Sequence, residues 1–350
     1  MGWACRSHLP AIVASPEFEL AAVCTTRMET ANESARQYGA RLVFDDYHKM
    51  LAHPEIDAVA VVLRVPAHYQ ITKDAINAGK HVFTEWPLGR TLEEAEELAA
   101  LARSKGVKVV VGLQARAAPA VLQMKQLVEE GYVGEIMSCS LRLTRGGVLA
   151  RPSDRTWQRD DELGATTLTI PAGHSIDAMR FVVGDFSEVS AVVSTQALEW
   201  LETDTQQLLD VTGPDNILVS GRLANGAVVS VHVASIPWAG SGYRLEIFGR
   251  EGTLVATSGD SPQLATVRLQ GARQGDELAE LPLSSDHTYV LGGMPQGAPF
   301  NVGQLYYLFG QAIRGEASRQ PDFDTAVSLH RLIESIRKAS NDKRAVAVPG

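Results

Sequence analysis

The chain has 350 residues, of which 45% are hydrophobic and 21% charged, a composition typical of a folded protein long enough for two domains. Its formal net charge of -9 argues against direct nucleic-acid binding, because nucleic-acid-binding domains usually carry a basic face. No apolar run approaches the roughly 20 residues of a membrane span and no secretion signal is recognisable, so we expect no membrane partner. The three cysteines are odd in number and widely spaced, which predicts no disulfide or metal site and a cytoplasmic location.

Between residues 18 and 113, apolar strand-like segments alternate with amphipathic helical segments. Gly39 and Gly79 end two of the helices, and Thr91 with Glu94 forms a capping box at the start of another. Successive strands joined by single helices predict a parallel sheet with helices on both faces. The expected strands are 18–24, 41–44, 56–63, 81–84 and 107–113, and the expected helices are 29–38, 45–52, 66–78 and 91–105.

After Gln114 the pattern changes to closely spaced strands between helices. Asn225-Gly226 is a strong hairpin signal, and the irregular segment 146–161 is long enough to suggest a functional loop. The sequence therefore predicts a Rossmann-type domain over 1–116 and an α+β domain with a large, mostly antiparallel open sheet over 117–350. The expected strands are 135–144, 188–195, 207–212, 216–223, 227–236, 243–248, 253–257 and 265–269, and the expected helices are 118–130, 165–183, 302–314 and 324–338.

The beginning of the chain departs from this pattern. A dinucleotide-binding fold needs a first strand and a Gly-rich turn before the first helix, and here no strand precedes Gly2-Trp3. Either the start of the coding sequence is misassigned, or the chain is truncated, or the protein lacks an inner strand. The third option removes backbone pairing and buried apolar area, so we favour the first two.

The segment 79–88, Gly-Lys-His-Val-Phe-Thr-Glu-Trp-Pro-Leu, combines a helix cap, a short buried strand and a Pro-containing turn. It resembles the Glu-Lys-Pro segment of the Gfo/Idh/MocA oxidoreductases, with Trp86 in place of the Lys. The Trp variant is similar to the galactose/lactose regulator-like branch, which includes a fungal regulator and bacterial oxidoreductases. Further matches to this branch are Gly2-Trp3-Ala4 followed by 8–11 (His-Leu-Pro-Ala), 112–116 (Gly-Leu-Gln-Ala-Arg), 173–177 (Gly-His-Ser-Ile-Asp) and 329–334 (Leu-His-Arg-Leu-Ile-Glu).

The resemblance implies a nicotinamide cofactor at the carboxyl ends of the strands. An acid at the end of the second strand would favour NAD, but this chain has Thr25, Thr26 and Arg27, whose hydroxyls and guanidinium suit a phosphate. We therefore predict NADP over NAD; the alternative is a solvated turn. His68 is either a cofactor neighbour or a solvent-facing helix residue. The remaining expected cofactor contacts are Gly2, Trp3, Val65, Pro66, Glu85, Trp86, Pro87 and Gln114.

The proton-transfer groups match the family only in part. Relatives use the Lys of the Glu-Lys-Pro segment together with an Asp and a His of the second domain, but here Trp86 and Ile170 occupy the Lys and Asp positions. His174 and Asp177 remain as catalytic candidates, because a His near its ordinary pKa serves as both acid and base near neutral pH. The alternative is that Asp177 holds His174 in a structural network.

The expected substrate contacts follow from residue type and position. Trp86 offers a flat surface for a sugar ring but would equally fill a core, and Arg116 either binds substrate or caps the junction between the domains. His174 would contact the substrate as the acid or base. Arg145 and Trp157, like Arg159 and Trp238, belong to loops of the second domain that could grip a polyol.

Two functions of different classes fit these residues. The first is an NADP-dependent oxidoreductase acting on a sugar, glycoside or polyol. The second is a catalytically silent NADP-binding sensor or regulator resembling the fungal galactose regulator. A lyase or hydrolase that activates its sugar by transient oxidation is a third possibility. The resemblance also implies a homo-oligomer, a dimer or a tetramer.

Overall fold

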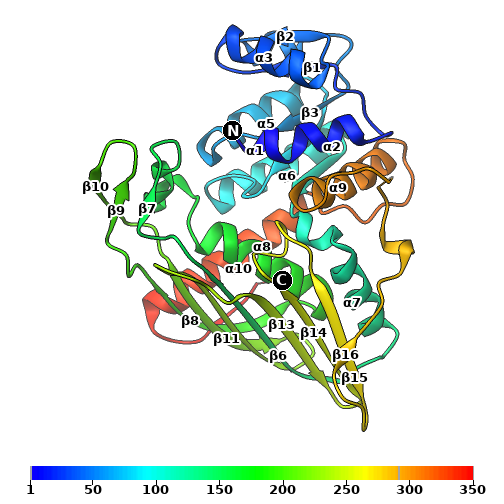
Figure 1. Cartoon of the computed structure of the whole chain (residues 1–350), viewed down its shortest axis with the longest axis vertical. Helices are drawn as coiled ribbons and strands as arrows, with labels where there is room; N and C mark the ends of the chain where they lie inside the picture. The colour runs from blue at the N-terminus through cyan, green and yellow to red at the C-terminus, as the bar shows by residue number, and fades with distance from the viewer. Residues whose placement is uncertain (1, 291, 350) are drawn as a thin grey trace. The chain divides into compact units, whose positions relative to one another are not determined.

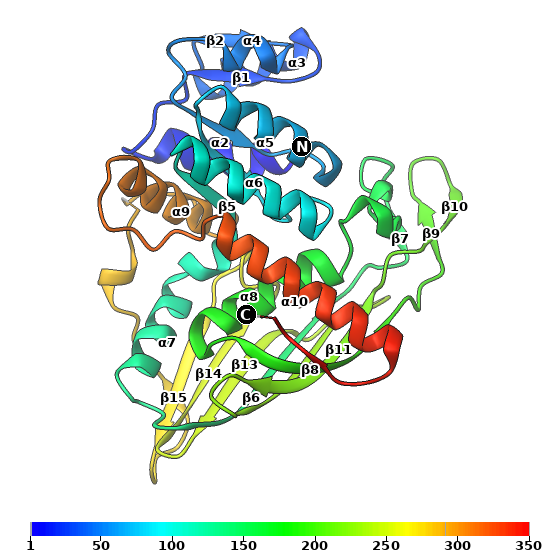
Figure 2. The same ribbon diagram turned by 180° about the vertical axis from the view of Figure 1, so that it is seen from behind.

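The computed structural model describes residues 2–290 and 292–349, which form two compact units (Figures 1 and 2). Unit 1 consists of Met1–Gly89, Glu93–Gln114 and Tyr289–Val327, and unit 2 of Arg90–Leu92, Ala115–Thr288 and Ser328–Gly350. The chain passes from unit 1 to unit 2 after Gln114, two residues before the boundary expected from the sequence. Residues 289–327, which the sequence pattern assigned to the second domain, cluster with unit 1.

Unit 1 contains two short parallel sheets with helices packed against them. One sheet pairs β1 with β2, and the other has the order β3-β4-β5. Within the described residues the two sheets share no strand pairing. The strands are β1 (Ala22–Cys24), β2 (Leu42–Phe44), β3 (Ala58–Val61), β4 (His81–Glu85) and β5 (Val109–Gly112). The helices are α1 (Trp3–Arg6), α2 (His8–Ala14), α3 (Met28–Tyr38), α4 (Tyr47–Leu51), α5 (His68–Asn77), α6 (Leu92–Lys105) and α9 (Ala298–Ile313), with the 3-10 turn η1 (Val65–Ala67).

The core of unit 1 surrounds β4 and β5. Val82, Phe83, Val110 and Val111 are fully buried on both faces of their strands, as is usual for the inner strands of a parallel sheet. The ring of Phe83 lies 4.9 Å from that of Tyr306 in α9, and α9 also packs against α2. These contacts bring a helix from the C-terminal third of the chain onto the sheet formed by the first third.

Unit 2 contains one large mixed sheet, covered on one face by α7, α8 and the later part of α10 (Figure 2). The strand order is β16-β15-β14-β13-β6-β12-β11-β8-β17, and only β6 and β12 pair in parallel, which confirms the mostly antiparallel sheet. The strands are β6 (Ile136–Arg145), β8 (Phe186–Ser194), β11 (Asn216–Leu223), β12 (Val228–Ser235), β13 (Gly242–Gly249), β14 (Gly252–Ser258), β15 (Arg268–Arg273), β16 (Ala279–Glu280) and β17 (Val346–Ala347). The helices are α7 (Pro119–Glu129), α8 (Gly173–Val183) and α10 (Phe323–Asp342).

Unit 2 has a second, small sheet, of which the sequence predicted one strand, β10, and not the other two. It has the order β10-β9-β7, with β7 (Ala150–Arg151), β9 (Glu199–Glu202) and β10 (Gln207–Asp210). β7 lies inside the segment 146–161, which the sequence predicted to be irregular, and the rest of that segment contains the 3-10 turn η3 (Thr156–Arg159). β9 was missed because the run Glu-Trp-Leu-Glu is too short and too charged to show a strand pattern.

Two other elements differ from the expectation. The strand expected at 18–24 begins only at Ala22, because its partner β2 begins at Leu42, opposite Ala22. The helix expected at 165–183 starts as a π-helix, η5 (Leu168–Ala172), and becomes α-helical at Gly173. Among the described residues, no helix is long and apolar enough to cross a membrane.

Candidate functional site

The carboxylate of Glu85, at the end of β4, is the centre of a buried polar group in unit 1. Its Oε2 accepts a hydrogen bond from Trp3 Nε1 at 2.8 Å, and its Oε1 lies 3.0 Å from His8 Nε2. The other ring nitrogen of His8 lies 2.9 Å from the Tyr306 hydroxyl. A neutral His8 satisfies both contacts, donating from Nε2 to Glu85 and accepting from Tyr306 at Nδ1. Burial, followed by the charge of Glu85, raises the pKa of Tyr306 well above its ordinary value, which keeps this hydroxyl a donor.

Gly112 makes room for this carboxylate. Gly112 pairs with Glu85 across β4 and β5. A Cβ at this position would lie 2.3 Å from Glu85 Oε1, closer than side-chain atoms approach one another. The predicted site residue Glu85 therefore depends on a glycine in the neighbouring strand, and both of its oxygens bind protein donors.

His68 holds the turn that follows β4. It is 1% exposed, which excludes the solvent-facing alternative considered for it. Its Nδ1 lies 2.7 Å from the carbonyl oxygen of Pro87, and its Nε2 lies 3.1 Å from that of Leu63. Burial lowers the pKa of His68 although both carbonyls favour the charged form. In the neutral ring only one nitrogen carries a proton, and we assign it to Nδ1 because its contact with Pro87 is the shorter. With this tautomer His68 donates to the carbonyl oxygen of Pro87 and so holds the turn after β4.

The other residues expected near the dinucleotide differ in exposure. Val65 and Trp86 are buried, Pro66 is exposed, and the peptide bond between Trp86 and Pro87 is cis. Gln114 is 1% exposed, and neither its side-chain oxygen nor its side-chain nitrogen has a protein hydrogen-bond partner. An orphaned buried amide is unusual in a folded protein and suits a polar group supplied by a ligand.

The turn after β1 leads directly into α3. The hydroxyl of Thr25 donates to the carbonyl oxygen of Arg27 at 2.8 Å and lies 2.6 Å from the Thr30 hydroxyl, so it shapes the turn itself. Thr26 and Arg27 are exposed, and Arg27 is the N-cap residue of the 11-residue helix α3. The amino-terminal end of a helix favours anions, and an exposed guanidinium adds to that preference.

His174 and Asp177 both lie in α8 of unit 2 and are 4% and 0% exposed. Each carboxylate oxygen of Asp177 accepts from Arg116, one from Nε and one from Nη2, both at 2.7 Å. Two residues that the sequence assigned to different roles therefore form one bidentate ion pair. The guanidinium of Arg116 also lies 5.1 Å from the ring centre of Phe181, one helical turn further along α8.

The backbone before His174 is unusual. The N–H of Ala172 donates to the carbonyl oxygen of Thr167, the five-residue spacing of a π-helix. Thr169 supports this turn, because its hydroxyl accepts from the N–H of Thr166 at 2.9 Å. Single π-helical turns occur frequently at functional sites, and this one directly precedes the catalytic candidate His174.

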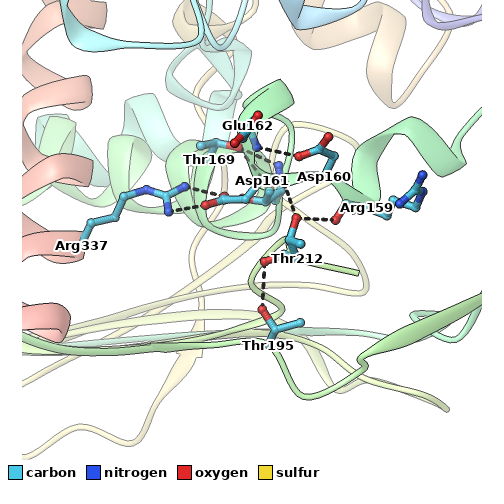
Figure 3. Close-up of polar contacts among 9 residues, drawn as sticks. Arg159, Asp160, Asp161, Glu162, Thr169, Thr195, Thr212 and Arg337 are labelled. Atoms are coloured by element: carbon cyan, nitrogen blue, oxygen red, sulfur yellow. Dashed lines mark hydrogen bonds and ion pairs between the residues drawn. The ribbon is translucent and has the colours of Figure 1, made fainter. Parts of the chain in front are cut away.

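The end of the segment 146–161 is fixed on two sides (Figure 3). Asp161 accepts from both terminal nitrogens of Arg337 in α10, at 2.8 and 2.7 Å. The N–H groups of Thr212 and Gly213 donate to the carbonyl oxygen of Arg159 at 2.9 and 2.8 Å. Trp157, in the same segment, is half-buried. Arg145, at the end of β6, forms an ion pair with Asp260 at 2.6 Å.

Sequence reasoning noted His8 only as part of a family match and did not name His8 or Tyr306 as a site residue. Their sequence separations from Glu85, 77 residues for His8 and more than 200 for Tyr306, gave no signal that they would meet its carboxylate. Among the described residues, no group of three or more His, Cys, Asp or Glu side chains is arranged to hold a metal ion.

Comparison with known proteins identifies both parts of the chain. Residues 1–113 match the family model described as an oxidoreductase family with an NAD-binding Rossmann fold, and residues 119–258 match the model of the C-terminal domain of Gal80p. Levoglucosan dehydrogenase of Pseudarthrobacter phenanthrenivorans is 30% identical over 377 residues, which cover 99% of this chain and 96% of that protein. The chain belongs to the Gfo/Idh/MocA oxidoreductase family.

The chain is also similar to the solved structure of an enzyme and to a regulatory protein. A structure of levoglucosan dehydrogenase in complex with NADH has a TM-score of 0.86 and 25% identity, covering 99% of this chain and 97% of that one. The galactose/lactose metabolism regulatory protein GAL80 of Saccharomyces cerevisiae is 27% identical over 244 residues, which cover 65% of this chain and 56% of the regulator. The expected family and fold class are confirmed, and the relatives support an NAD(P)-dependent oxidoreductase.

Proposed function

We propose that this protein is an NADP-dependent oxidoreductase that acts on a sugar, glycoside or related polyol, with His174 as the acid or base. The observation that carries the proposal is the buried His174 in the first turn of α8, directly after a π-helical turn. The likeness to levoglucosan dehydrogenase over almost the whole of both chains supports the substrate class.

His174 handles the proton of the substrate hydroxyl. A nicotinamide cofactor supplies the acceptor or donor of hydride, and the hydroxyl proton needs a separate base. His174 takes that proton when the alcohol is oxidised and returns it when the ketone is reduced. Arg116 forms an ion pair with Asp177 of α8, and the two act as positioning residues for this step.

Residues of unit 1 supply the polar groups for the cofactor. The buried amide of Gln114 has no protein partner and fits a group with both donors and acceptors, such as a carboxamide. Gly2, Trp3, Val65, Pro66, Trp86 and the backbone of Glu85 and Pro87 complete the proposed set. His68 acts indirectly, by holding the carbonyl of Pro87.

The preference for NADP rests on the turn after β1. Exposed Thr26 and Arg27 at the start of α3 favour a 2′-phosphate, and no carboxylate occupies the turn 25–27 to accept from a 2′-hydroxyl. Calorimetry with both cofactors tests this directly. We expect NADP to bind at least tenfold more tightly than NAD, and Arg27→Ala to remove most of the difference while Arg36→Ala does not. Equal affinities in the wild-type protein would contradict the proposal.

The redox proposal is tested by nicotinamide absorbance during incubation with NADP and a panel of sugars, glycosides and polyols, and with NADPH and the keto-sugars. We expect turnover that His174→Ala abolishes and that replacement of the exposed His48 by Ala leaves unchanged. Turnover that survives in His174→Ala would remove this residue from the mechanism.

The alternative function is a catalytically silent NADP-binding regulator. The match to the GAL80 protein and the presence of Trp86 and Ile170 in place of two proton-transfer groups favour it. Cofactor binding without any absorbance change across the panel would support this alternative over the enzyme.

We further propose that the protein forms a homo-oligomer through the uncovered face of its large sheet. Leu218 lies between Val192 and His232 in neighbouring strands, and a hollow of about 490 Å³ runs across this face. Val192, Leu218 and Val228 expose 58%, 47% and 48% of their surface, an apolar patch that suits a second copy. Sedimentation should give a dimer or tetramer that Leu218→Glu converts to monomer and Leu278→Glu does not. A monomeric wild-type protein would refute the proposal.

The three cysteines, Cys5, Cys24 and Cys139, are all free. We accordingly propose a reducing, cytoplasmic location.

A further inference from the structure

A small cavity inside unit 2 has an unusual lining. It has a volume of about 80 Å³, several times the roughly 10–15 Å³ that one water needs. Three arginines from the segment between β6 and η3 contribute to its wall, together with residues of β9 and of the segment before η5. The lining residues that matter here are Arg145, Arg151, Arg155, Gln158, Thr166 and Trp200.

The buried polar groups around this cavity lack protein partners. Nε of Arg151, the Thr166 hydroxyl and Nε1 of Trp200 are each buried without a hydrogen bond. Thr166 and Trp200 are both only 5% exposed. Two of these three groups can only donate, and a hydroxyl can donate as well. Leaving such donors unpaired costs roughly 1–3 kcal/mol each. The protein supplies no acceptor to these three groups.

Basic side chains outnumber acidic ones in the lining. Arg145, Arg151 and Arg155 are its basic residues, and Asp215 is its acid. Arg145 forms an ion pair with Asp260. Asp215 is already occupied, because it accepts from the N–H groups of Gln196 and Ala197 at 2.9 and 2.7 Å.

Arg151 is held in place beside the cavity. Its Nη1 donates to the side-chain oxygen of Gln158 at 2.7 Å, and its guanidinium lies 4.2 Å from the ring centre of Trp200. Trp200 in turn packs in a small apolar cluster with Val148, Ala197 and Val211. Burial, and then the charges of Arg155 and Arg145, lower the pKa of Arg151 to about 10, so it remains a cation at neutral pH.

We propose that this cavity binds the carboxylate group of a small ligand. A carboxylate supplies only acceptors and a negative charge, which matches the orphaned donors of Arg151, Thr166 and Trp200 and the arginines of the lining. All its residues belong to unit 2. The lining also includes Ile170, four residues before His174, and Arg145, one of the expected substrate contacts, so this inference rests on the proposed function and deepens it, while carboxylate binding itself requires no nicotinamide.

The test follows the indole N–H resonance of Trp200 in the full chain, without any nicotinamide, during titration with sodium acetate. Trp200→Phe identifies the resonance by removing it. Acetate should shift the resonance saturably at constant ionic strength, and equal concentrations of glycerol should not. Arg151→Gln should weaken acetate binding at least tenfold, and Arg222→Gln should not, because Arg222 lies seven residues along β11 from Asp215, about 23 Å.

Thr166→Val is the second variant, since it keeps the charge and shape of the wall while removing one donor. We expect it to weaken acetate binding about threefold to tenfold, which keeps the test valid should Arg151→Gln fail to fold. Three results would overturn the proposal: no acetate-dependent shift, an equal shift with glycerol, or binding of inorganic phosphate but not acetate. Acetate binding that Thr166→Val and Arg151→Gln leave unchanged would also overturn it.

Discussion

Replacing Gly112 by Ala directly tests the buried carboxylate of Glu85. The added Cβ would lie 2.3 Å from Oε1, 2.8 Å from Cδ and 3.0 Å from Cα of Glu85. The carboxylate must move, and its bonds with Trp3 and His8 break or lengthen. Hydrogen bonds to a charged group contribute about 1.5–3 kcal/mol each and overpacking costs about 1–3 kcal/mol. Since some strain relaxes, we expect the free energy of unfolding to fall by about 3 kcal/mol.

Urea unfolding of four proteins measures this effect: wild type, Gly112→Ala, Glu85→Ala and the double variant. Removing the Glu85 side chain clears the space, so Gly112→Ala should then cost less than about 1 kcal/mol, a coupling energy of about 2 kcal/mol. Gly259→Ala is the matched control, because a Cβ there meets nothing within 4 Å, and we expect a change within about 0.5 kcal/mol. Equal costs of Gly112→Ala in the two backgrounds, or a cost as small as that of Gly259→Ala, would refute the assigned role of Gly112.

Two further predictions concern unit 2. Arg116→Ala leaves the fully buried Asp177 carboxylate without its bidentate partner and should lower the free energy of unfolding by about 3–5 kcal/mol. The double variant Arg116→Met with Asp177→Leu removes both charges and should lower it by less. Urea unfolding that ranks the two variants in the opposite order would contradict this account. Burial lowers the pKa of His330 from 6.5 to about 4, so the folded state binds this proton less readily than the unfolded chain. Stability from this group is complete above pH 6.5 and falls as the pH drops towards 4, by about 2 kcal/mol between pH 7 and pH 5. His330→Leu should lose that part of the pH dependence in urea unfolding, and an unchanged dependence would exclude His330 as its source.

Local patterns in the sequence were sufficient for most of the fold. Strict alternation of apolar strands and capped helices located β3, β4 and β5; β3 and β5 lie within the predicted ranges, and β4 extends one residue beyond its range, to Glu85. The same reasoning failed for β7 and β9, whose residues form strands only because they pair with each other in a small sheet. Short strands of this kind are specified by tertiary pairing, and propensity alone does not reveal them.

The structure joins two of the predicted site residues in a way that the sequence did not indicate. Arg116 and Asp177 were singled out for different tasks, substrate binding and catalysis, and the structure joins them in one ion pair. Their separation of 61 residues gives no local signal that they meet. The cavity beside Arg151 and Trp200 was not predicted. Its wall combines several separate segments of the chain, and the feature that its donors share, the lack of a hydrogen-bond partner, is visible only in the structure.

Glu85 illustrates how a family motif and its structural role can differ. The motif locates Glu85 at the end of a strand, where ligands bind in open α/β sheets. In this chain both of its oxygens bind Trp3 and His8, and His8 also contacts Tyr306 of α9. The carboxylate therefore ties α1 and α2 to β4 directly and α9 through His8. The turn at Trp86 and Pro87 follows directly, and His68 holds the carbonyl of Pro87. The polar groups that the motif brings to this strand end therefore position the backbone of the turn, and the carboxylate of Glu85 stays buried.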